Sequence, residues 1–311
     1  MLTAQTHELR NPDPDEALIR QTAVGLNYID IQHRTGRYPL PTYPSPIGLE
    51  AAGVVEAVGT RVETVRRGDR VVYSAPPIGA YADWRLMPSD RLVRLPPDIL
   101  DEIAAAVLTK GLTAHYLLFT TYSVRAGETI LVHAAAGGVG QLLCQWAHHL
   151  GARVIGTAGS DAKAEIARQH GCDATIVYTR EDFVARVRAL TGGAGVPVVY
   201  DAVGRDTFEG SLNCLKPRGV LVSFGTPSGP IPPFDLFRLN TMGSLYVTSP
   251  AFVTHTQERS DLLERSRALF DGIARGVLRV AISGRYPLAD AARAHADLQG
   301  RRTAGAQILV P

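Results

Sequence analysis

The sequence has 311 residues, of which 45% are hydrophobic and 20% are charged. This length suits two domains of ordinary size better than one large domain, and the composition is that of a soluble globular protein rather than a disordered chain. The formal net charge is +2 and the pI is about 8.5, without any run of Lys or Arg. The charge therefore gives no reason to expect nucleic acid or an acidic membrane as a partner.

The chain lacks the usual marks of secretion or membrane insertion. Its apolar stretches are short and broken by Gly or polar residues, so no membrane span is expected. Segment 1–16 has neither the basic nor the apolar region of a signal peptide. The three cysteines, Cys144, Cys172 and Cys214, lie singly and far apart, which predicts buried thiols rather than a disulfide framework or a zinc knuckle. We expect a cytoplasmic protein.

The first hundred residues show short strand patterns. Residues 17–25 and 51–58 alternate or cluster β-branched residues, and Arg70–Ser74 forms a further strand candidate. Gly and Pro turns such as TGRYPLPTYPSP separate them. This pattern predicts a small, irregular, barrel-like β domain. Residues 98–122 then change to helical periodicity.

From residue 128 onward, strand and helix patterns alternate. The predicted strands are 129–134, 152–158, 174–178, 197–203, 219–225 and 243–248, and the predicted helices are 139–150, 161–170, 182–190 and 206–215. Strands that alternate with helices at this spacing predict an α/β fold with a parallel, doubly wound sheet. A helix over 258–276, a turn at Pro287 and a short helix lead to a last strand, 306–311. We expect this tail to return to the first domain, because the wound sheet is already complete.

The strongest chemical signal is a glycine-rich turn, HAAAGGVG, between a strand and a helix. Ala134, Gly137 and Gly140 have the spacing of a dinucleotide-binding turn. A pyrophosphate needs unhindered backbone N–H groups at a helix amino terminus, and the last glycine lets the helix pack closely on the strand. The context of strand, turn, helix and second strand predicts a dinucleotide site.

The end of the second strand favours NADPH over NADH. An NAD enzyme places Asp or Glu there to hold the ribose 2′-hydroxyl, whereas this chain has Ala158. Lys163 follows on the next helix, where a cation can meet a 2′-phosphate, and Tyr178 ends the third strand nearby. The alternative is that Lys163 is an ordinary solvent-exposed helix residue. The nearby acid Asp161 also weakens the case for a phosphate.

These residues belong to a series of seven motifs that together resemble those of a known protein family. AVGLNYIDIQHRTGRYP, GLEAAGVVEAVG, RRGDRVVY, KGLTAHYLL, HAAAGGVGQLLCQWA, VVYDAVGRDT and GSLYVT occur in this order. Nearly the whole chain resembles the zinc-independent quinone oxidoreductases of the zeta-crystallin type, a branch of the medium-chain dehydrogenase/reductase superfamily. The resemblance implies a GroES-like catalytic domain formed by residues 1–112 and 253–311, with a Rossmann NADPH-binding domain at 113–252.

The resemblance also implies a set of cofactor-binding residues: Asn27, Thr113, Gly137, Gly138, Val139, Ser160, Lys163, Tyr178, Phe224, Val247 and Arg301. Val247 lies in a strand expected to touch the nicotinamide amide through main-chain groups. The family's opening strand has no counterpart here, so we expect one edge of the β domain to be missing or the start of the sequence to be late. Gln32 stands where relatives often carry an aromatic residue, which leaves the shape of the acceptor pocket open.

Zinc is not expected. Related zinc alcohol dehydrogenases bind the metal through a Cys and a His whose aligned positions here hold Asn27 and Leu49. An amide and an isobutyl group cannot supply the ligands that zinc requires. His33, His115 and His133 are each isolated from any ligand partner in the sequence, and structural or exposed histidines are commoner than ligands.

Without a Lewis acid, the chain is better suited to an electrophilic acceptor than to a simple alcohol. The resemblance and this chemistry together predict hydride transfer from NADPH to a quinone. Asn27 and Tyr38 are the polar groups expected nearest the acceptor oxygen, with cofactor-ribose binding and surface packing as their respective alternatives. No side-chain general acid is evident. The alternatives are an enone or alkenal double-bond reductase, and a non-enzymatic NADPH-binding protein of the zeta-crystallin kind.

The final strand of the wound sheet, 243–248, predicts a homodimer. It is apolar, contains the aromatic Tyr246 and carries no charge or proline to discourage pairing. Two copies that pair across a two-fold axis would satisfy both rows of backbone groups. The resemblance implies the same arrangement, and the alternative is a strand covered by the carboxy-terminal helix.

Overall fold

The chain divides into two compact units in this computed structural model, which describes residues 2–300 and 302–311. The terminal unit comprises Met1–Lys110, Glu258–Ala274 and Val280–Pro311, and the central unit comprises Gly111–Gln257 and Arg275–Arg279. The boundary between them falls inside helix α2 (Asp101–Tyr116).

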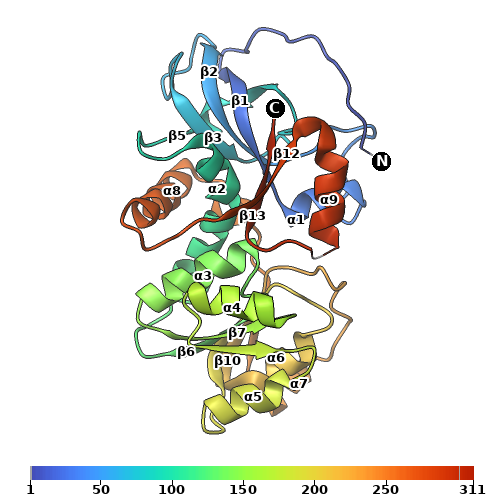
Figure 1. Ribbon diagram of the computed structural model, residues 1–311, viewed down its shortest axis with the longest axis vertical. Helices are drawn as coiled ribbons and strands as arrows, with labels where there is room; N and C mark the ends of the chain where they lie inside the picture. Colours follow the sequence, from blue (N-terminus) through green and yellow to red (C-terminus); the bar gives the residue numbers. More distant parts are fainter. Residues whose placement is uncertain (1, 301) are drawn as a thin grey trace. The chain divides into compact units, whose positions relative to one another are not determined.

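The terminal unit is built on a seven-stranded sheet in the order β12-β13-β1-β2-β3-β5, with β4 also paired to β1. Its strands are β1 (Glu16–Leu26), β2 (Glu50–Val58), β3 (Arg70–Ser74), β4 (Trp84–Pro88), β5 (Val93–Arg94), β12 (Ile282–Pro287) and β13 (Ala306–Val310). Figure 1 shows β1 beside β13, which pairs antiparallel with it. The last strand of the chain thus pairs with the first one.

Strand β1 shows why this sheet forms. Its first half alternates buried and less buried residues, with Ala17 and Ile19 fully buried, as expected for a strand with one covered face. Its second half is buried at nearly every position. Helices α1 (Tyr28–Arg34), α8 (Arg259–Ala274) and α9 (Ala291–Gln299) complete the unit.

The central unit has the predicted doubly wound parallel sheet. Its strands are β6 (Thr129–Val132), β7 (Arg153–Ala158), β8 (Ala174–Val177), β9 (Val196–Asp201), β10 (Leu215–Ser223) and β11 (Tyr246–Thr248). They lie in the order β11-β10-β9-β6-β7-β8 and all pair in parallel. This is the Rossmann order, in which the order of the strands reverses between β6 and β9. Sheets of this kind bind ligands outside the carboxyl ends of the strands at that point.

The helices of the central unit alternate with its strands, as predicted. They are α3 (Gly138–His149), α4 (Asp161–Gln169), α5 (Phe183–Leu190), α6 (Phe208–Cys214) and the short α7 (Phe237–Thr241). The core between sheet and helices includes Leu131, Val199 and Phe208, all at most 1% exposed.

Two features of the sequence look different once the chain is folded. The stretch Asp101–Thr121, which comprises α2 and a π-helical turn, is long and apolar enough to cross a membrane by length and composition. Its most apolar window is 78% buried inside the protein, as in the core helix of a soluble fold, so these two criteria alone are weak evidence. In addition, two of the cysteines that lie far apart in sequence meet in space, because the Sγ atoms of Cys144 and Cys172 are 3.4 Å apart. All three thiols are free and buried, so the prediction of buried thiols is confirmed.

Candidate cofactor site

The glycine-rich turn leaves the amino terminus of α3 open. Gly137 is the N-cap of this 12-residue helix, and no side chain caps it. Ala134 begins the turn with a φ of 53°, a left-handed conformation that folds the chain back toward the helix. Backbone N–H groups in the first turn of an uncapped helix, together with the helix dipole, form a site suited to a phosphate.

Gly140 serves close packing in this turn. A Cβ on Gly140 would lie 2.3 Å from the carbonyl oxygen of Ala134 and 2.9 Å from backbone atoms of Ala135. At Gly137 the nearest atom would be 3.1 Å away. The two glycines therefore differ: Gly140 lets helix and turn touch, whereas a Cβ at Gly137 would meet the turn less closely. The role of Gly137 toward a phosphate stays a prediction.

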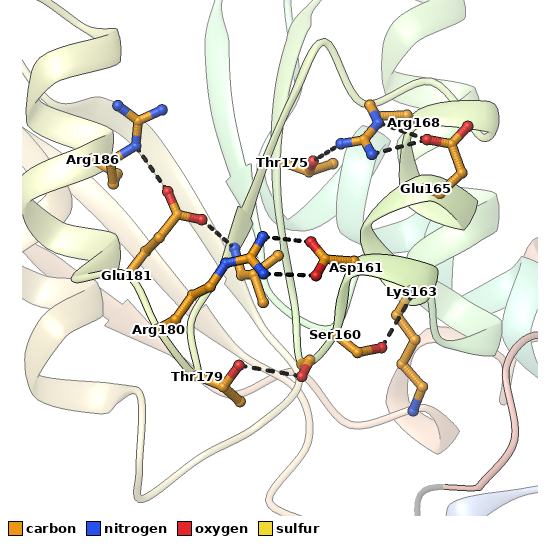
Figure 2. A network of polar contacts seen from close by, with 12 residues as sticks. Ser160, Asp161, Lys163, Glu165, Arg168, Thr175, Thr179, Arg180, Glu181 and Arg186 are labelled. Atoms are coloured by element: carbon orange, nitrogen blue, oxygen red, sulfur yellow. Dashed lines mark hydrogen bonds and ion pairs between the residues drawn. The ribbon is translucent and has the colours of Figure 1, made fainter.

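A second group of predicted residues gathers where β7 and β8 end. Ala158 ends β7 and is buried, so no carboxylate occupies that position. Ser160 caps α4, and its hydroxyl oxygen accepts a hydrogen bond from the backbone N–H of Lys163 (Figure 2). The hydroxyl of Tyr178 lies over Gly159, since a Cβ there would be 2.9 Å from it. A hydroxyl, a phenol and an ammonium group on these elements are chemically suited to a 2′-phosphate.

The remaining predicted residues of the central unit are more dispersed. Phe224 directly follows β10, Val247 lies in β11 opposite Leu221, and Thr113 is buried on α2. The ends of parallel strands place Phe224 at the same sheet edge as the glycine-rich turn and Ser160. Arg301 lies outside the described residues.

In the terminal unit, Asn27 is held by a buried polar network. Its Nδ2 donates to Oε2 of Glu50 at 2.7 Å and approaches Oγ1 of Thr109 at 3.4 Å, while its Oδ1 accepts from Nζ of Lys110 at 2.8 Å. These partners fix the orientation of the amide and use both of its hydrogens. Oδ1 keeps a second lone pair, which is able to accept one further hydrogen bond. The role of Asn27 toward a cofactor or an acceptor stays a prediction.

Glu50 and Lys110 form the base of this network, and neither was assigned a role from the sequence. Glu50 Oε1 accepts from the backbone N–H of Thr109 at 2.6 Å, and Lys110 Nζ lies 3.8 Å from Glu50 Oε2. Burial raises the pKa of Glu50 and lowers that of Lys110, and each charge partly opposes the shift of the other. Gly25 makes room, because a Cβ there would lie 2.4 Å from the Glu50 carboxylate.

A hydrogen-bonded chain lies next to Asn27. Asp30 Oδ2 accepts from the backbone N–H of Asn27 at 2.9 Å and from the hydroxyl of Tyr81 at 3.1 Å. That hydroxyl is 2.9 Å from Nε2 of His295. Burial raises the pKa of Asp30 to about 7 and lowers the pKa of His295 to about 4. Asp30 is fully buried, and its contacts hold the backbone of Asn27 and the hydroxyl of Tyr81 in place.

Tyr38 is placed differently. Its side chain is 49% exposed, and its ring meets His33 edge-on with centroids 6.3 Å apart. Its role toward an acceptor stays a prediction.

Family models of known proteins match segments of both units. A family model for an alcohol dehydrogenase GroES-like domain matches residues 13–97, and one for a zinc-binding dehydrogenase matches 138–267. Quinone oxidoreductase of Pseudomonas aeruginosa is 49% identical over 311 residues, which cover all of this chain and 96% of that protein. The chain belongs to the quinone oxidoreductase family. The family and the combination of a Rossmann sheet with a GroES-like domain, both expected from the motifs, are confirmed.

Two further relatives are informative. The crystal structure of Escherichia coli quinone oxidoreductase complexed with NADPH matches with a TM-score of 0.97 at 46% identity, covering 99% of this chain and 95% of that one. A 2-haloacrylate reductase from Burkholderia is 44% identical, covering 97% of this chain and 92% of that protein. The relatives of this chain therefore include a protein named as the reductase of an unsaturated acid.

One of the two family models is described as zinc-binding, but the residues of this chain at the positions of the zinc ligands are not suited to zinc. Leu49 is an apolar, buried residue, and Asn27 is bonded to Glu50 and Lys110. Over residues 2–300 and 302–311 no group of three or more His, Cys, Asp or Glu side chains is arranged to hold a metal. His133 bonds instead to the hydroxyls of Thr157 and Ser211 at 2.9 and 3.0 Å.

Proposed function

We propose that this protein is an NADPH-dependent quinone oxidoreductase that transfers a hydride to a quinone without a metal. The proposal rests on two neighbouring features at one edge of the central sheet: the start of α3, and the residues that follow β7 and β8. There the uncapped start of α3 is suited to a pyrophosphate, and Ser160, Lys163 and Tyr178 are suited to a 2′-phosphate in the absence of a carboxylate at Ala158. The names of the relatives support the same activity.

The chain's own residues bind and orient the reactants. The backbone of Gly137, Gly138 and Val139 would hold the pyrophosphate of NADPH, and Phe224 and Val247 would flank its nicotinamide. Asn27, fixed by Lys110 and Glu50, accepts a hydrogen bond from a ribose hydroxyl. NADPH supplies a hydride when bound, and a conjugated acceptor takes it without a Lewis acid because the charge delocalises. Protons reach the reduced acceptor from water.

A second activity, reduction of an activated carbon–carbon double bond, is favoured by the 2-haloacrylate reductase among the relatives. Steady-state assays with NADPH and a panel of quinones and enones separate the two. We expect kcat/KM to be at least about tenfold higher for quinones than for enones, and to be unchanged by chelators. A preference for enones would move the protein to the second activity, and no turnover of either would favour a non-enzymatic NADPH-binding role.

The domain roles and surroundings follow from this proposal. The catalytic domain comprises residues 1–112 and 253–311, and the NADPH-binding domain comprises 113–252. The protein acts in the cytoplasm, away from membranes and nucleic acid, which the mildly basic net charge of +2 supports.

The protein also forms a homodimer through the edge strand of its central sheet. Strand β11 is a terminal strand of that sheet, and Tyr246 on it is 59% exposed. Leu236 and Phe237, earlier in the same segment of the chain, are also exposed, and exposed large apolar side chains of this kind are often covered at an interface.

Light scattering at micromolar concentration should give the mass of a dimer. Replacing Tyr246 with Asp would set two charges against each other at the interface and shift the protein toward monomers. Replacing the equally exposed Tyr43 with Asp is the control and should leave the mass unchanged. A monomeric unaltered protein would contradict the dimer.

A further inference from the structure

A carboxylate stands beside the residues proposed to receive the 2′-phosphate. Asp161 is the first residue of α4 and directly follows the capping Ser160. A negative side chain is favourable at a helix amino terminus, but its charge would repel a phosphate dianion bound at the same place. The preference for NADPH inferred from Ala158 and Lys163 therefore needs an explanation of how this charge is tolerated.

Arg180 supplies that explanation. Figure 2 shows its guanidinium facing the carboxylate of Asp161 with two parallel contacts. Nη1 donates to Oδ2 at 2.6 Å, and Nη2 donates to Oδ1. This fork-to-fork geometry is the strongest form of an Arg–carboxylate pair. The pairing lowers the pKa of Asp161 chiefly through the hydrogen bond from Arg180, so both groups are charged at neutral pH.

The pair comes from the two elements that carry the predicted phosphate ligands. Asp161 lies on α4 next to Ser160, and Arg180 lies two residues after Tyr178, just beyond β8. In Figure 2 the ammonium of Lys163 projects away from the pair. The carboxylate of Asp161 is thus paired with Arg180 rather than with Lys163.

Other acids near this edge have partners of their own. Glu181 lies 3.2 Å from Nε of Arg186, and Glu165 lies 2.9 Å from Nη2 of Arg168. Arg180 donates its hydrogen bonds to Asp161, while Glu181 and Arg168 add only weaker electrostatic effects on the two members of the pair.

We propose that Arg180 is a specificity-determining positioning residue, which holds Asp161 aside and neutralises it so that the site accepts the 2′-phosphate of NADPH. The inference rests on the proposed NADPH site. It assigns to Arg180 an effect that operates through Asp161 and that is felt by NADPH but not by NADH, because NADH carries a hydroxyl where NADPH carries the phosphate.

The pair is suited to a mutational test, because both side chains are largely exposed, at 58% and 70% of their free area. Exposed ion pairs contribute little to folding, so its removal should leave the fold intact. Thermal unfolding of each variant checks this. Arg61→Gln is the matched control, since it breaks a similarly exposed Arg–Asp pair with two contacts, that of Arg61 with Asp15 in the terminal unit.

The test is calorimetric titration of the purified full-length protein with NADPH and with NADH. Arg180→Gln should raise the Kd for NADPH roughly 5- to 20-fold and change the Kd for NADH by less than about twofold. Asp161→Asn alone should change either Kd by no more than about threefold, and the double variant should return NADPH affinity to within about threefold of the unaltered protein. Arg180→Lys should keep most of the NADPH affinity, because it retains the charge.

The outcomes separate this inference from the proposal beneath it. If the unaltered protein binds both cofactors equally, the NADPH site and the role of Arg180 both fail. If it prefers NADPH and Arg180→Gln leaves that preference intact, only the role of Arg180 fails. If the double variant is as weak as Arg180→Gln, Arg180 does not act through Asp161, and the inference is overturned.

Discussion

Replacing Gly140 with alanine should destabilise the central unit by about 3 kcal/mol or more and abolish NADPH binding. The added Cβ would lie 2.3 Å from the carbonyl oxygen of Ala134, a backbone atom that cannot move without shifting the whole turn. Helix α3 would be displaced from the strand end that it covers. For a unit of this size, a loss of this magnitude lowers the Tm by about 6–12 °C.

Gly137→Ala is the matched control for this prediction. Gly137 has a φ of −76° and ψ of 170°, which any residue adopts, and a Cβ there meets its nearest atom at 3.1 Å. Its Tm should stay within a few degrees of the unaltered value, while NADPH affinity falls roughly tenfold or more because a methyl group now faces the phosphate. Scanning calorimetry and cofactor titration measure both. A Gly140→Ala protein with an unaltered Tm would contradict the packing role.

Lys110→Met should cost about 3–5 kcal/mol of the free energy of unfolding, as expected when one partner of a buried charge pair is removed. The ammonium donates to Oδ1 of Asn27 and to the carbonyl oxygen of Leu26, and it lies 3.8 Å from Glu50. Methionine fills a similar volume but leaves the Glu50 carboxylate buried without a cation. Lys216→Met, at an exposed lysine, should change stability by less than about 0.5 kcal/mol.

The loss at Lys110 should depend on pH. Burial raises the folded-state pKa of Glu50 above its unfolded value, and removing Lys110 raises it further. At a pH between the unfolded and the folded-state pKa of Glu50, the folded protein holds a proton that the unfolded chain has lost. The free energy of unfolding therefore falls as pH rises through that range. The deficit of Lys110→Met should therefore be larger at pH 8 than at pH 5.5.

A second substitution should repair the first. With Lys110 absent, the Asn27 amide is free to turn over and accept from the Nε2 of a glutamine at position 50, so Lys110→Met with Glu50→Gln should recover most of the lost stability. Urea unfolding of the four proteins measures this coupling. Strictly additive effects would show that Lys110 and Glu50 do not act as a pair.

The fold was predictable where sequence signals are local. The strands and helices of the central unit follow the alternation of apolar runs and turns, and their bounds differ from the prediction by a few residues. Strand β12 was missed because Gly284 and Pro287 interrupt its pattern. Strand β11 is shorter than predicted, since Gly243 and Ser244 adopt positive φ values and extended structure begins only at Tyr246.

The candidate site divides in the same way. The glycine-rich turn and Ser160 could be predicted because the residues of a phosphate site at a helix start are close together in the sequence. The network around Asn27 was not, because β1, β2 and α2 must fold before Asn27, Glu50 and Lys110 meet. A lysine inside the apolar helix α2 was the available signal, since a buried cation requires a partner. Arg180 and Asp161 are likewise joined only by the pairing of β7 with β8.

The central claim is that the edge of the Rossmann sheet formed by α3, α4 and the ends of β7 and β8 is an NADPH site. Calorimetric titration of the unaltered protein with NADPH and NADH at one ionic strength tests it most directly. The geometry around Ala158, Ser160 and Lys163 predicts that NADPH binds at least about tenfold more tightly than NADH. Equal affinities, or tighter binding of NADH, would contradict it.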